Sequence, residues 1–208
     1  MIRCIVADDH PIVINGVRQL LLSEFPTAEI AEVHDSESLV RKVIKERWDL
    51  VIIDLNMPGR SGLDALAEIR NEYPKLPVLV MSMFPEDQYA LRVMKAGASG
   101  YLVKTSIHEE LINAVRTVLG GRKFITSSIA QKLADSLQHN TQVPHELLSN
   151  REYDVFILLA QGTNVSEIAT KINLSPTTIS TYRGRIMEKM NLKSNADLTR
   201  YALERNLI

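Results

Sequence analysis

The sequence predicts an α/β doubly wound, five-stranded parallel sheet followed by a small all-α helix-turn-helix domain. Three observations lead to this prediction. Short apolar runs alternate with helical patterns as far as Arg122, the pattern then changes, and only helical periodicity remains from Leu147 onward. Alternating strands and helices are typical of a parallel sheet with helices on both faces.

Five strands are expected in the first part. Four are apolar runs rich in β-branched residues, whereas the second alternates polar and apolar residues as an edge strand does. They lie at residues 2–7, 29–33, 50–53, 77–81 and 101–103. Helices between the strands are indicated by apolar residues that share a face, with Pro11 suited to the first turn of the first helix and Gly120 to the end of the last. The pairs on these faces are Val13 and Val17, Leu39 and Val43, Leu63 and Leu66, Val93 and Met94, and Leu111 and Val115.

The change of pattern after Arg122 predicts two domains connected by a linker. Residues 1–122 form the sheet domain, residues 123–145 a linker, and residues 146–208 the helical domain. Within the linker, Ile129, Leu133 and Leu137 indicate a short helix capped by Ser127 or Ser128. The polar, uncharged stretch 138–144 is typical of a flexible connection.

Composition excludes several classes of protein. Among 208 residues, 24 Lys and Arg balance 25 Asp and Glu, so the net charge of −1 excludes a strongly basic or acidic tail. A single cysteine, Cys4, excludes a disulfide framework and a cysteine-rich zinc site, and its place in the first strand favours a small buried hydrophobe. Since no apolar run approaches 18 residues and no apolar leader precedes the first strand, we expect a cytoplasmic protein with no membrane partner.

The helical domain is predicted to contain a helix-turn-helix. Ser149 and Glu152 form a capping-box pattern before its first helix. Ser166 is expected to cap a short helix at 167–172, and Ser175 with Pro176 to start a longer helix that ends near Met190. A short helix, a turn and a longer helix is the arrangement that places a recognition helix in the major groove of DNA.

The longer helix separates into a core face and an outer face. The core stripe is predicted to contain Ile179, Tyr182, Ile186 and Met190. The candidates for contact with double-stranded DNA are Thr177, Ser180, Thr181 and Gly184 on the opposite face, Tyr182 and Arg183 for shared base contacts, and Arg185 and Lys189 beside Arg183 for phosphates. An ordinary solvated face is the alternative interpretation of these basic side chains. Because eight basic and seven acidic residues give 146–208 a net charge of only +1, tight DNA binding is expected to need two copies.

Polar side chains end four of the predicted strands. Asp8 and Asp9 follow the first strand, Asp54 ends the third, Ser82 ends the fourth and Lys104 the fifth. If the first and third strands are neighbours, three carboxylates share one cleft at the carboxyl edge of the sheet, which suits Mg²⁺.

Each of these residues taken singly has a simpler interpretation. Asp8 and Asp9 would be capping residues, Asp54 would open the turn at 55–59, and Lys104 would be a surface lysine. Their joint occurrence at consecutive strand ends favours a site. His10 is interpreted as a residue at the start of a helix rather than as a metal ligand.

With these motifs in place, residues 1–122 resemble two-component receiver domains, which have a flavodoxin-like fold. The motifs are Val-Ala-Asp-Asp-His-Pro at 6–11, Ile-Ile-Asp-Leu-Asn-Met-Pro-Gly at 52–59, Val-Met-Ser at 80–82 and Ala-Gly-Ala-Ser-Gly-Tyr-Leu-Val-Lys at 96–104. The resemblance implies that Asp54 accepts a phosphoryl group from a phosphohistidine on a cognate sensor histidine kinase. It also implies Mg²⁺ held by Asp9, Asp54 and the backbone carbonyl of Asn56, with Asp8 assisting through water.

The same resemblance implies which residues respond to phosphorylation of Asp54. Lys104 would pair with one phosphoryl oxygen and Ser82 would donate to another, while Tyr101 would be the aromatic residue that turns inward when Ser82 moves.

Two positions depart from the receiver pattern. Thr105 stands where many receivers have a proline after a cis bond, so we expect a trans bond here. Met83 replaces a small alanine and is expected to narrow access to Asp54. Asn56 and Phe84 are expected to tune the lifetime of the aspartyl phosphate.

Residues 147–208 resemble the LuxR-type helix-turn-helix of the NarL/FixJ class of response regulators. The signatures are Leu-Ser-Asn-Arg-Glu-Tyr-Asp-Val at 148–155, Glu-Ile-Ala at 167–169 and Leu-Ser-Pro-Thr-Thr-Ile-Ser-Thr-Tyr at 174–182. The resemblance implies dimerisation through the last helix, at about 196–205, with Leu198, Tyr201 and Ala202 as the seam of a homodimer that forms on phosphorylation. Some relatives have a lysine where this chain has Ser180 or Gly184, so a bidentate lysine contact to a base is not expected there.

The function that follows is a phosphorylation-controlled transcription regulator rather than an enzyme. Phosphorylation would reorganise the face with Ser82 and Tyr101, and this face or the linker at 124–144 would then alter dimerisation and free the recognition helix. One alternative keeps DNA binding but makes its control independent of phosphate, through constitutive dimers or an auxiliary partner. Two others are disfavoured: a phosphohydrolase, because position 56 is Asn where those enzymes have Asp, and a quorum sensor, because residues 1–122 have a phosphoacceptor pattern.

Overall fold

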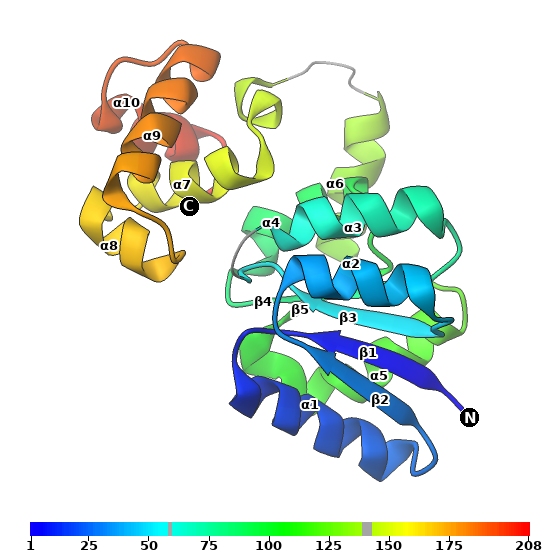
Figure 1. Ribbon diagram of the computed structural model, residues 1–208. Helices are drawn as coiled ribbons and strands as arrows, with labels where there is room; N and C mark the ends of the chain where they lie inside the picture. The colour runs from blue at the N-terminus through cyan, green and yellow to red at the C-terminus, as the bar shows by residue number, and fades with distance from the viewer. Residues whose placement is uncertain (58–59, 139–142) are drawn as a thin grey trace. The chain divides into compact units, whose positions relative to one another are not determined.

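The computed structural model describes residues 1–57, 60–138 and 143–208 (Figure 1). The chain divides into two compact units, Met1–Asp135 and Ser136–Ile208, which are described separately. Two predicted features fall partly outside the described residues: the turn at 55–59 and the polar linker at 138–144. Within the described ranges, no helix is both long enough and apolar enough to cross a membrane.

The first unit is built on a five-stranded parallel sheet with the order β2-β1-β3-β4-β5. Its strands are β1 (Arg3–Ala7), β2 (Glu29–Val33), β3 (Leu50–Asp54), β4 (Val78–Ser82) and β5 (Gly100–Val103). β3 and β4 are buried along their whole length, which explains their uninterrupted apolar sequences, whereas β2 lies at the edge and alternates. The predicted fold class is confirmed, and β1 and β3 are neighbours, as the shared acidic cleft requires.

Five helices cover the two faces of this sheet (Figure 1). They are α1 (Pro11–Glu24), α2 (Ser36–Lys45), α3 (Gly62–Glu72), α4 (Glu86–Lys95) and α5 (Ile107–Leu119). α1 and α5 pack together on one face, where Ile14, Val17 and Leu111 meet Cys4 and Val6 in a single apolar core. Because successive strand residues point to opposite faces, Ile5 and Ala7 face the side covered by α2 and α3.

The segment after α5 extends the sheet before it becomes a helix. The backbone N–H of Phe124 donates to Ser99 at 2.9 Å, and the Phe124 carbonyl accepts from Tyr101 at 3.3 Å. The chain then enters α6 (Ser127–Gln138). The cap predicted at Ser127 or Ser128 is wrong by one or two residues, because the hydroxyl of Thr126 accepts from the N–H of Ile129.

The second unit contains a 3₁₀ turn, η2 (Pro144–Leu147), and the helices α7 (Asn150–Ala160), α8 (Val165–Lys171), α9 (Pro176–Met190) and α10 (Asn195–Glu204). The capping box of Ser149 and Glu152 at the start of α7 is confirmed. The cap predicted at Ser166 is wrong. α8 begins two residues earlier than expected, and Asn164 caps it in a second capping box with Glu167.

The helix-turn-helix predicted from residue 167 to about residue 190 is confirmed as α8, a turn and α9. Asn173 makes the turn with a positive φ of 58°, which Asn tolerates better than most residues. Ile179, Ile186 and Met190 are buried as predicted, while Tyr182 is only half-buried. α7 packs against both α9 and α10, so one helix organises the core of this unit.

Candidate functional site

Asp8, Asp54 and Lys104 meet at the carboxyl edge of the sheet. Asp54 is the last residue of β3, and the register that pairs Ala7 with Ile53 sets Asp8 beside it. The ammonium Nζ of Lys104, which follows β5, lies 2.7 Å from Asp8 Oδ2 and 2.9 Å from Asp54 Oδ2. The convergence predicted from the strand ends is therefore confirmed, while the chemical roles of these residues remain predictions.

Burial shifts the pKa values of charged groups in this site. Asp8 is 0% and Asp54 1% exposed. Burial raises the pKa of Asp54 to about 6, a shift that the Lys104 cation opposes and the Asp8 charge supports. Burial by itself would lower the pKa of Lys104, but its ion pairs with Asp54 and Asp8 raise it overall, so the lysine stays protonated at neutral pH.

A close backbone contact holds Asp54 in place. Gly62 begins α3, and its N–H donates to the carbonyl of Leu55 at 3.1 Å. A Cβ at position 62 would stand 2.3 Å from the backbone oxygen of Asp54. Only glycine therefore lets α3 begin this close to the end of β3.

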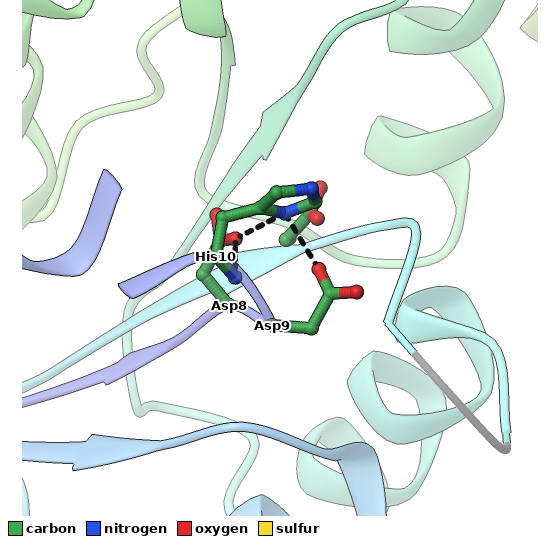
Figure 2. Close-up of side chains that lie close together, drawn as sticks. Asp8, Asp9 and His10 are labelled. Carbon is green, nitrogen blue, oxygen red and sulfur yellow. Dashed lines mark hydrogen bonds and ion pairs between the residues drawn. The ribbon is translucent and has the colours of Figure 1, made fainter. Parts of the chain in front are cut away.

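Asp9 and His10 complete the acidic cluster (Figure 2). The Nδ1 atom of the His10 ring lies 2.7 Å from Asp9 Oδ1 and 3.1 Å from Asp8 Oδ1. Potential ligand atoms of Asp8, Asp9, His10 and Asp54 all lie within 4.8 Å of one another. His10 occupies the cap position of α1, as its sequence position indicated, but the contact of its ring with two carboxylates was not expected.

The oxygen atoms of the cluster suit a divalent cation. Asp54 Oδ1 and Asn56 Oδ1 are buried, and neither accepts a hydrogen bond of ordinary geometry from the part of the chain that the structure describes. Buried carboxylate oxygens without donors are costly unless a cation or a proton compensates them. The residues present therefore fit Mg²⁺, which prefers a few carboxylates completed by carbonyl and water oxygens.

Ser82 and Tyr101 are connected through the backbone of Phe84. The Ser82 hydroxyl accepts from the N–H of Phe84 at 3.1 Å, and the Tyr101 hydroxyl donates to the Phe84 carbonyl at 2.7 Å. Both side chains are buried, and the Phe84 ring stacks on Tyr89 at 4.4 Å between centroids. A displacement of Ser82 would therefore act on the Phe84 backbone, whose carbonyl accepts the hydrogen bond from the Tyr101 hydroxyl.

The two departures from the receiver pattern lie at the rim of the site. Thr105 belongs to the 3₁₀ turn η1 (Lys104–Ser106), and its peptide bond is trans as predicted, like every other bond in the described ranges. Met83 is 61% exposed and lines an apolar groove of about 590 Å³ together with Val17, Leu20 and Ile107. The expectation that Met83 narrows access to Asp54 stays a prediction.

The outer face of α9 carries small polar side chains. Thr177, Ser180, Thr181 and Gly184 are exposed, as the sorting by face predicted. The hydroxyls of Ser180 and Thr181 donate to carbonyls one turn earlier, each at 3.0 Å, so their free lone pairs can accept from a ligand.

The basic residues of α9 differ in whether their side chains interact with other residues of the same domain. Arg185 is exposed, whereas Arg183 donates to Asn195 Oδ1 at 2.8 Å. The Lys189 ammonium lies 2.6 Å from the carboxylate of Glu152, a residue that is only 2% exposed. Lys189 thus has a structural partner within its own domain, which sequence reasoning missed.

Comparison with known proteins agrees with this geometry. The family described as response regulator receiver domain matches residues 4–116, and the family of bacterial regulatory proteins, luxR family, matches residues 146–202. The chain is a response regulator. It belongs to the NarL/FixJ class, in which a receiver domain is joined to a LuxR-type DNA-binding domain.

Relatives of this response regulator match it over nearly its whole length. The oxygen regulatory protein NreC of Staphylococcus epidermidis is 34% identical, with 99% of each chain covered. The response regulator UvrY of Escherichia coli is 32% identical over 100% of this chain and 96% of UvrY. RcsB of Salmonella enterica serovar Typhimurium, solved bound to promoter rprA with the phosphomimetic BeF₃⁻, has a TM-score of 0.61 at 27% identity, covering 97% of this chain and 98% of RcsB.

The dimer seam predicted for this regulator needs correction. Leu198 and Ala202 are both 0% exposed because they face α7 inside their own domain. Tyr201 is half-buried, and its hydroxyl lies 2.9 Å from His145 Nδ1. The exposed side of α10 instead carries Ala196, Arg200 and Leu203, of which Leu203 is 58% exposed.

Proposed function

We propose that this response regulator receives a phosphoryl group on Asp54 from a cognate sensor histidine kinase and then binds its operator DNA as a dimer. The observation that carries the proposal is the contact of Lys104 with both Asp8 and Asp54 at the edge of the sheet. We keep residues 1–122, 123–145 and 146–208 as its receiver, linker and DNA-binding parts. DNA as its target places the working protein in the cytoplasm.

The transfer step needs a nucleophile and a means of balancing charge. A carboxylate oxygen of Asp54 forms a bond to phosphorus while the bond between phosphorus and the imidazole nitrogen of the kinase phosphohistidine breaks, and that nitrogen keeps the bonding electron pair. The Lys104 cation then faces the negative charge of the product.

Mg²⁺ is the proposed cofactor. Asp9, Asp54 and the backbone carbonyl of Asn56 would hold it, with Asp8 assisting through water. Once bound, this ion would neutralise charge on the phosphoryl oxygens. The buried Asp54 Oδ1, which accepts no hydrogen bond of ordinary geometry from the described residues, supports the assignment.

The signal would leave the site through Ser82. Its contact with the Phe84 backbone leads to Tyr101, and the backbone of Tyr101 bonds to Phe124 at the start of the linker. A phosphoryl group that draws Ser82 toward Asp54 would therefore act on the linker through three successive hydrogen bonds. We propose that this coupling changes dimerisation and frees the recognition helix.

DNA recognition is assigned to α9. Its outer face would enter the major groove with the hydroxyls of Thr177, Ser180 and Thr181 toward base edges and Gly184 allowing close approach. Arg185 is the proposed phosphate contact, since Lys189 is engaged by Glu152. Tyr182 and Arg183 would act from the flank of the helix.

The outward face of α10 replaces the corrected seam as the proposed dimer surface. Leu203 provides exposed apolar area near the C-terminal end of this face, and Arg200 adds charge about one turn earlier. Pairing two copies doubles the number of phosphates neutralised, which a domain of net charge +1 needs for tight binding. RcsB, in one related structure, was solved as two dimers bound to two parallel DNAs.

The test measures phosphorylation and DNA binding together. The full chain is incubated with Mg²⁺ and a small phosphodonor, and intact mass and gel-shift affinity for candidate promoters are recorded. Asp54→Ala is the test variant, and Glu72→Ala, an exposed carboxylate at the end of α3, is the matched control.

We expect one added phosphoryl group and stronger DNA binding for the wild type and for Glu72→Ala, and neither for Asp54→Ala. Phosphorylation of Asp54→Ala would overturn the assignment of the acceptor. Unchanged DNA binding after phosphorylation of the wild type would overturn control of DNA affinity and favour the phosphate-independent hypothesis.

A further inference from the structure

The ring of His10 stands against the carboxylates of the acidic cluster rather than in solvent alone. Its Nδ1 lies 2.7 Å from Asp9 Oδ1 and 3.1 Å from Asp8 Oδ1 (Figure 2). The backbone N–H of His10 also donates to Asp8 Oδ1 at 2.9 Å, and this bond orients the residue at the start of α1. The side chain stays 60% exposed, so the ring covers the solvent side of the cluster.

Lys104 and His10 contact different oxygens of Asp8. Lys104 takes Oδ2 and His10 faces Oδ1. An ion beside His10 could therefore use Asp8 Oδ1 and Asp9 Oδ1 without displacing the lysine. Asp54 Oδ1, which is buried and accepts no hydrogen bond of ordinary geometry within the described ranges, offers a further oxygen.

The spacing of these atoms suits a small divalent ion. One ligand atom from each of Asp8, Asp9, His10 and Asp54 can be chosen so that all four lie within 4.8 Å of one another. Ligand atoms at about 2.1 Å from a metal on opposite sides are separated by about 4.2 Å, so only a modest contraction is needed. Three carboxylates with one imidazole form a mixed oxygen and nitrogen set, which differs from the oxygen-only set that suits Mg²⁺.

We propose that His10 is a metal ligand of this site, through Nδ1, and that it gives the site affinity for divalent transition metal ions of the Co²⁺ and Zn²⁺ class in addition to Mg²⁺. Imidazole binds these ions well, whereas Mg²⁺ keeps oxygen ligands and water. The inference rests on the metal site of the proposed function. It adds that the identity of residue 10 sets the choice of metal.

The experiment is a metal titration of the full chain at one fixed pH. Co²⁺ binding is followed by its visible absorption, and Mg²⁺ is measured by competition against Co²⁺. His10→Ala and His10→Gln are the test variants. His34→Gln is the matched control, because the Nδ1 atom of His34 lies 3.2 Å from the backbone oxygen of Asp8 but its ring is not part of the cluster.

We expect both His10 variants to lose roughly ten-fold or more of their Co²⁺ affinity and to keep their Mg²⁺ affinity within about two-fold. His34→Gln should match the wild type for both ions. Proton NMR of the Co²⁺-bound wild type should show the large contact shift of a coordinated histidine ring, and this signal should be lost on changing His10 and kept on changing His34.

Two results would overturn the inference. Equal Co²⁺ affinity of the wild type and both His10 variants would show that the ring is no ligand, and a rise in affinity for both ions would show that it competes with metal. A wild-type chain that binds neither ion would instead overturn the metal site of the proposed function, so the two failures are distinguishable.

Discussion

At the scale of single residues, the carboxyl group of Asp54 is almost completely buried. Burial raises its pKa from 3.8 to about 6, with the cation of Lys104 opposing this shift and the charge of Asp8 adding to it. Because this value lies above that of the unfolded chain, the folded protein binds more protons between the two values. The stability contributed by Asp54 is therefore present at low pH and is lost as the pH rises through about 6.

Asp54→Asn should consequently stabilise the receiver domain in metal-free buffer at pH 7. The shift of about two pKa units corresponds to a gain of up to about 3 kcal/mol. The gain should shrink as the pH falls from about 6 through 4, because below the unfolded pKa of 3.8 the wild-type carboxyl is protonated in both states. Urea unfolding at several pH values, followed by the fluorescence of Trp48, measures it.

The exposed Glu72→Gln provides the control for this experiment and should change the unfolding free energy by less than about 0.5 kcal/mol at any pH. A variant Asp54→Asn that is less stable than the wild type at pH 7 would show that the ion pair with Lys104 outweighs the cost of burial.

At the scale of secondary structure, caps decide where the short helices begin. α8 has only seven residues, so its N-terminal capping box satisfies a large share of its backbone groups. Asn164 Oδ1 accepts from the N–H of Glu167 at 3.0 Å, and a carboxylate oxygen of Glu167 accepts from the N–H of Asn164 at 3.3 Å. Ser166 lies inside the helix and has no such role.

Asn164→Ala should therefore destabilise the helix-turn-helix domain by about 1 kcal/mol, and Ser166→Ala should change its stability by only a few tenths of a kcal/mol. Thermal unfolding of the full chain followed by circular dichroism compares the two variants. Equal effects would contradict the cap at Asn164 and restore the one expected at Ser166.

An ion pair joins α7 to α9, with a buried carboxylate on Glu152 and a 40% exposed ammonium side chain on Lys189. The Glu152 side chain is 3% exposed and bonds both to the Lys189 ammonium and to the N–H of Ser149. Burial would raise the pKa of Glu152, but Lys189 and Ser149 more than offset this and lower it. The stability that this group provides is thus present at neutral pH and is lost on acidification through its lowered pKa.

Lys189→Met keeps most of the aliphatic stem and removes the cation, so Glu152 would be left buried and partly uncompensated. We expect a loss of about 1–3 kcal/mol in unfolding free energy. Glu152→Gln and the double variant complete a double-mutant cycle in chemical denaturation. Strictly additive effects would show that the pair contributes no coupling.

At the scale of the whole molecule, assembly rather than net charge must supply DNA affinity. The domain at 146–208 has eight basic and seven acidic residues, and two cations of α9, Lys189 and Arg183, are engaged by Glu152 and Asn195. A second copy brings a second recognition helix, which raises affinity without any change of charge in one chain. The proposed dimer surface on α10 should therefore matter for operator binding as much as the proposed recognition helix.

Leu203→Asp should abolish dimerisation of the phosphorylated chain and weaken operator binding, because it replaces the exposed apolar side chain on the outward face of α10 with a charge. Its unfolding free energy should stay within about 0.5 kcal/mol of the wild type. Analytical ultracentrifugation with and without phosphodonor measures the assembly.

Leu198→Ala is the complementary variant, since Leu198 is buried against α7. It should cost about 2–5 kcal/mol of stability through the cavity that it leaves. Dimers that persist in Leu203→Asp would place the interface elsewhere on the molecule.

The sequence by itself determined the order of the elements, the fold class and the candidate site at the ends of the strands. Strand runs, helical periodicity and the capping box of Ser149 depend on neighbours along the chain, and the parallel topology brings Asp8, Asp54 and Lys104 to one edge. These features are local or follow from a general rule of connection.

Only the tertiary structure decided which partner each face and each charge meets. The pattern of Leu198 and Ala202 marks an apolar stripe on α10, but an identical stripe would suit either a neighbouring helix or a second copy. In the same way, Lys189 meets Glu152, 37 residues away along the chain, and the ring of His10 meets Asp9. Such pairings depend on how elements pack in three dimensions, because spacing along one helix shows which side chains share a face but not what covers that face.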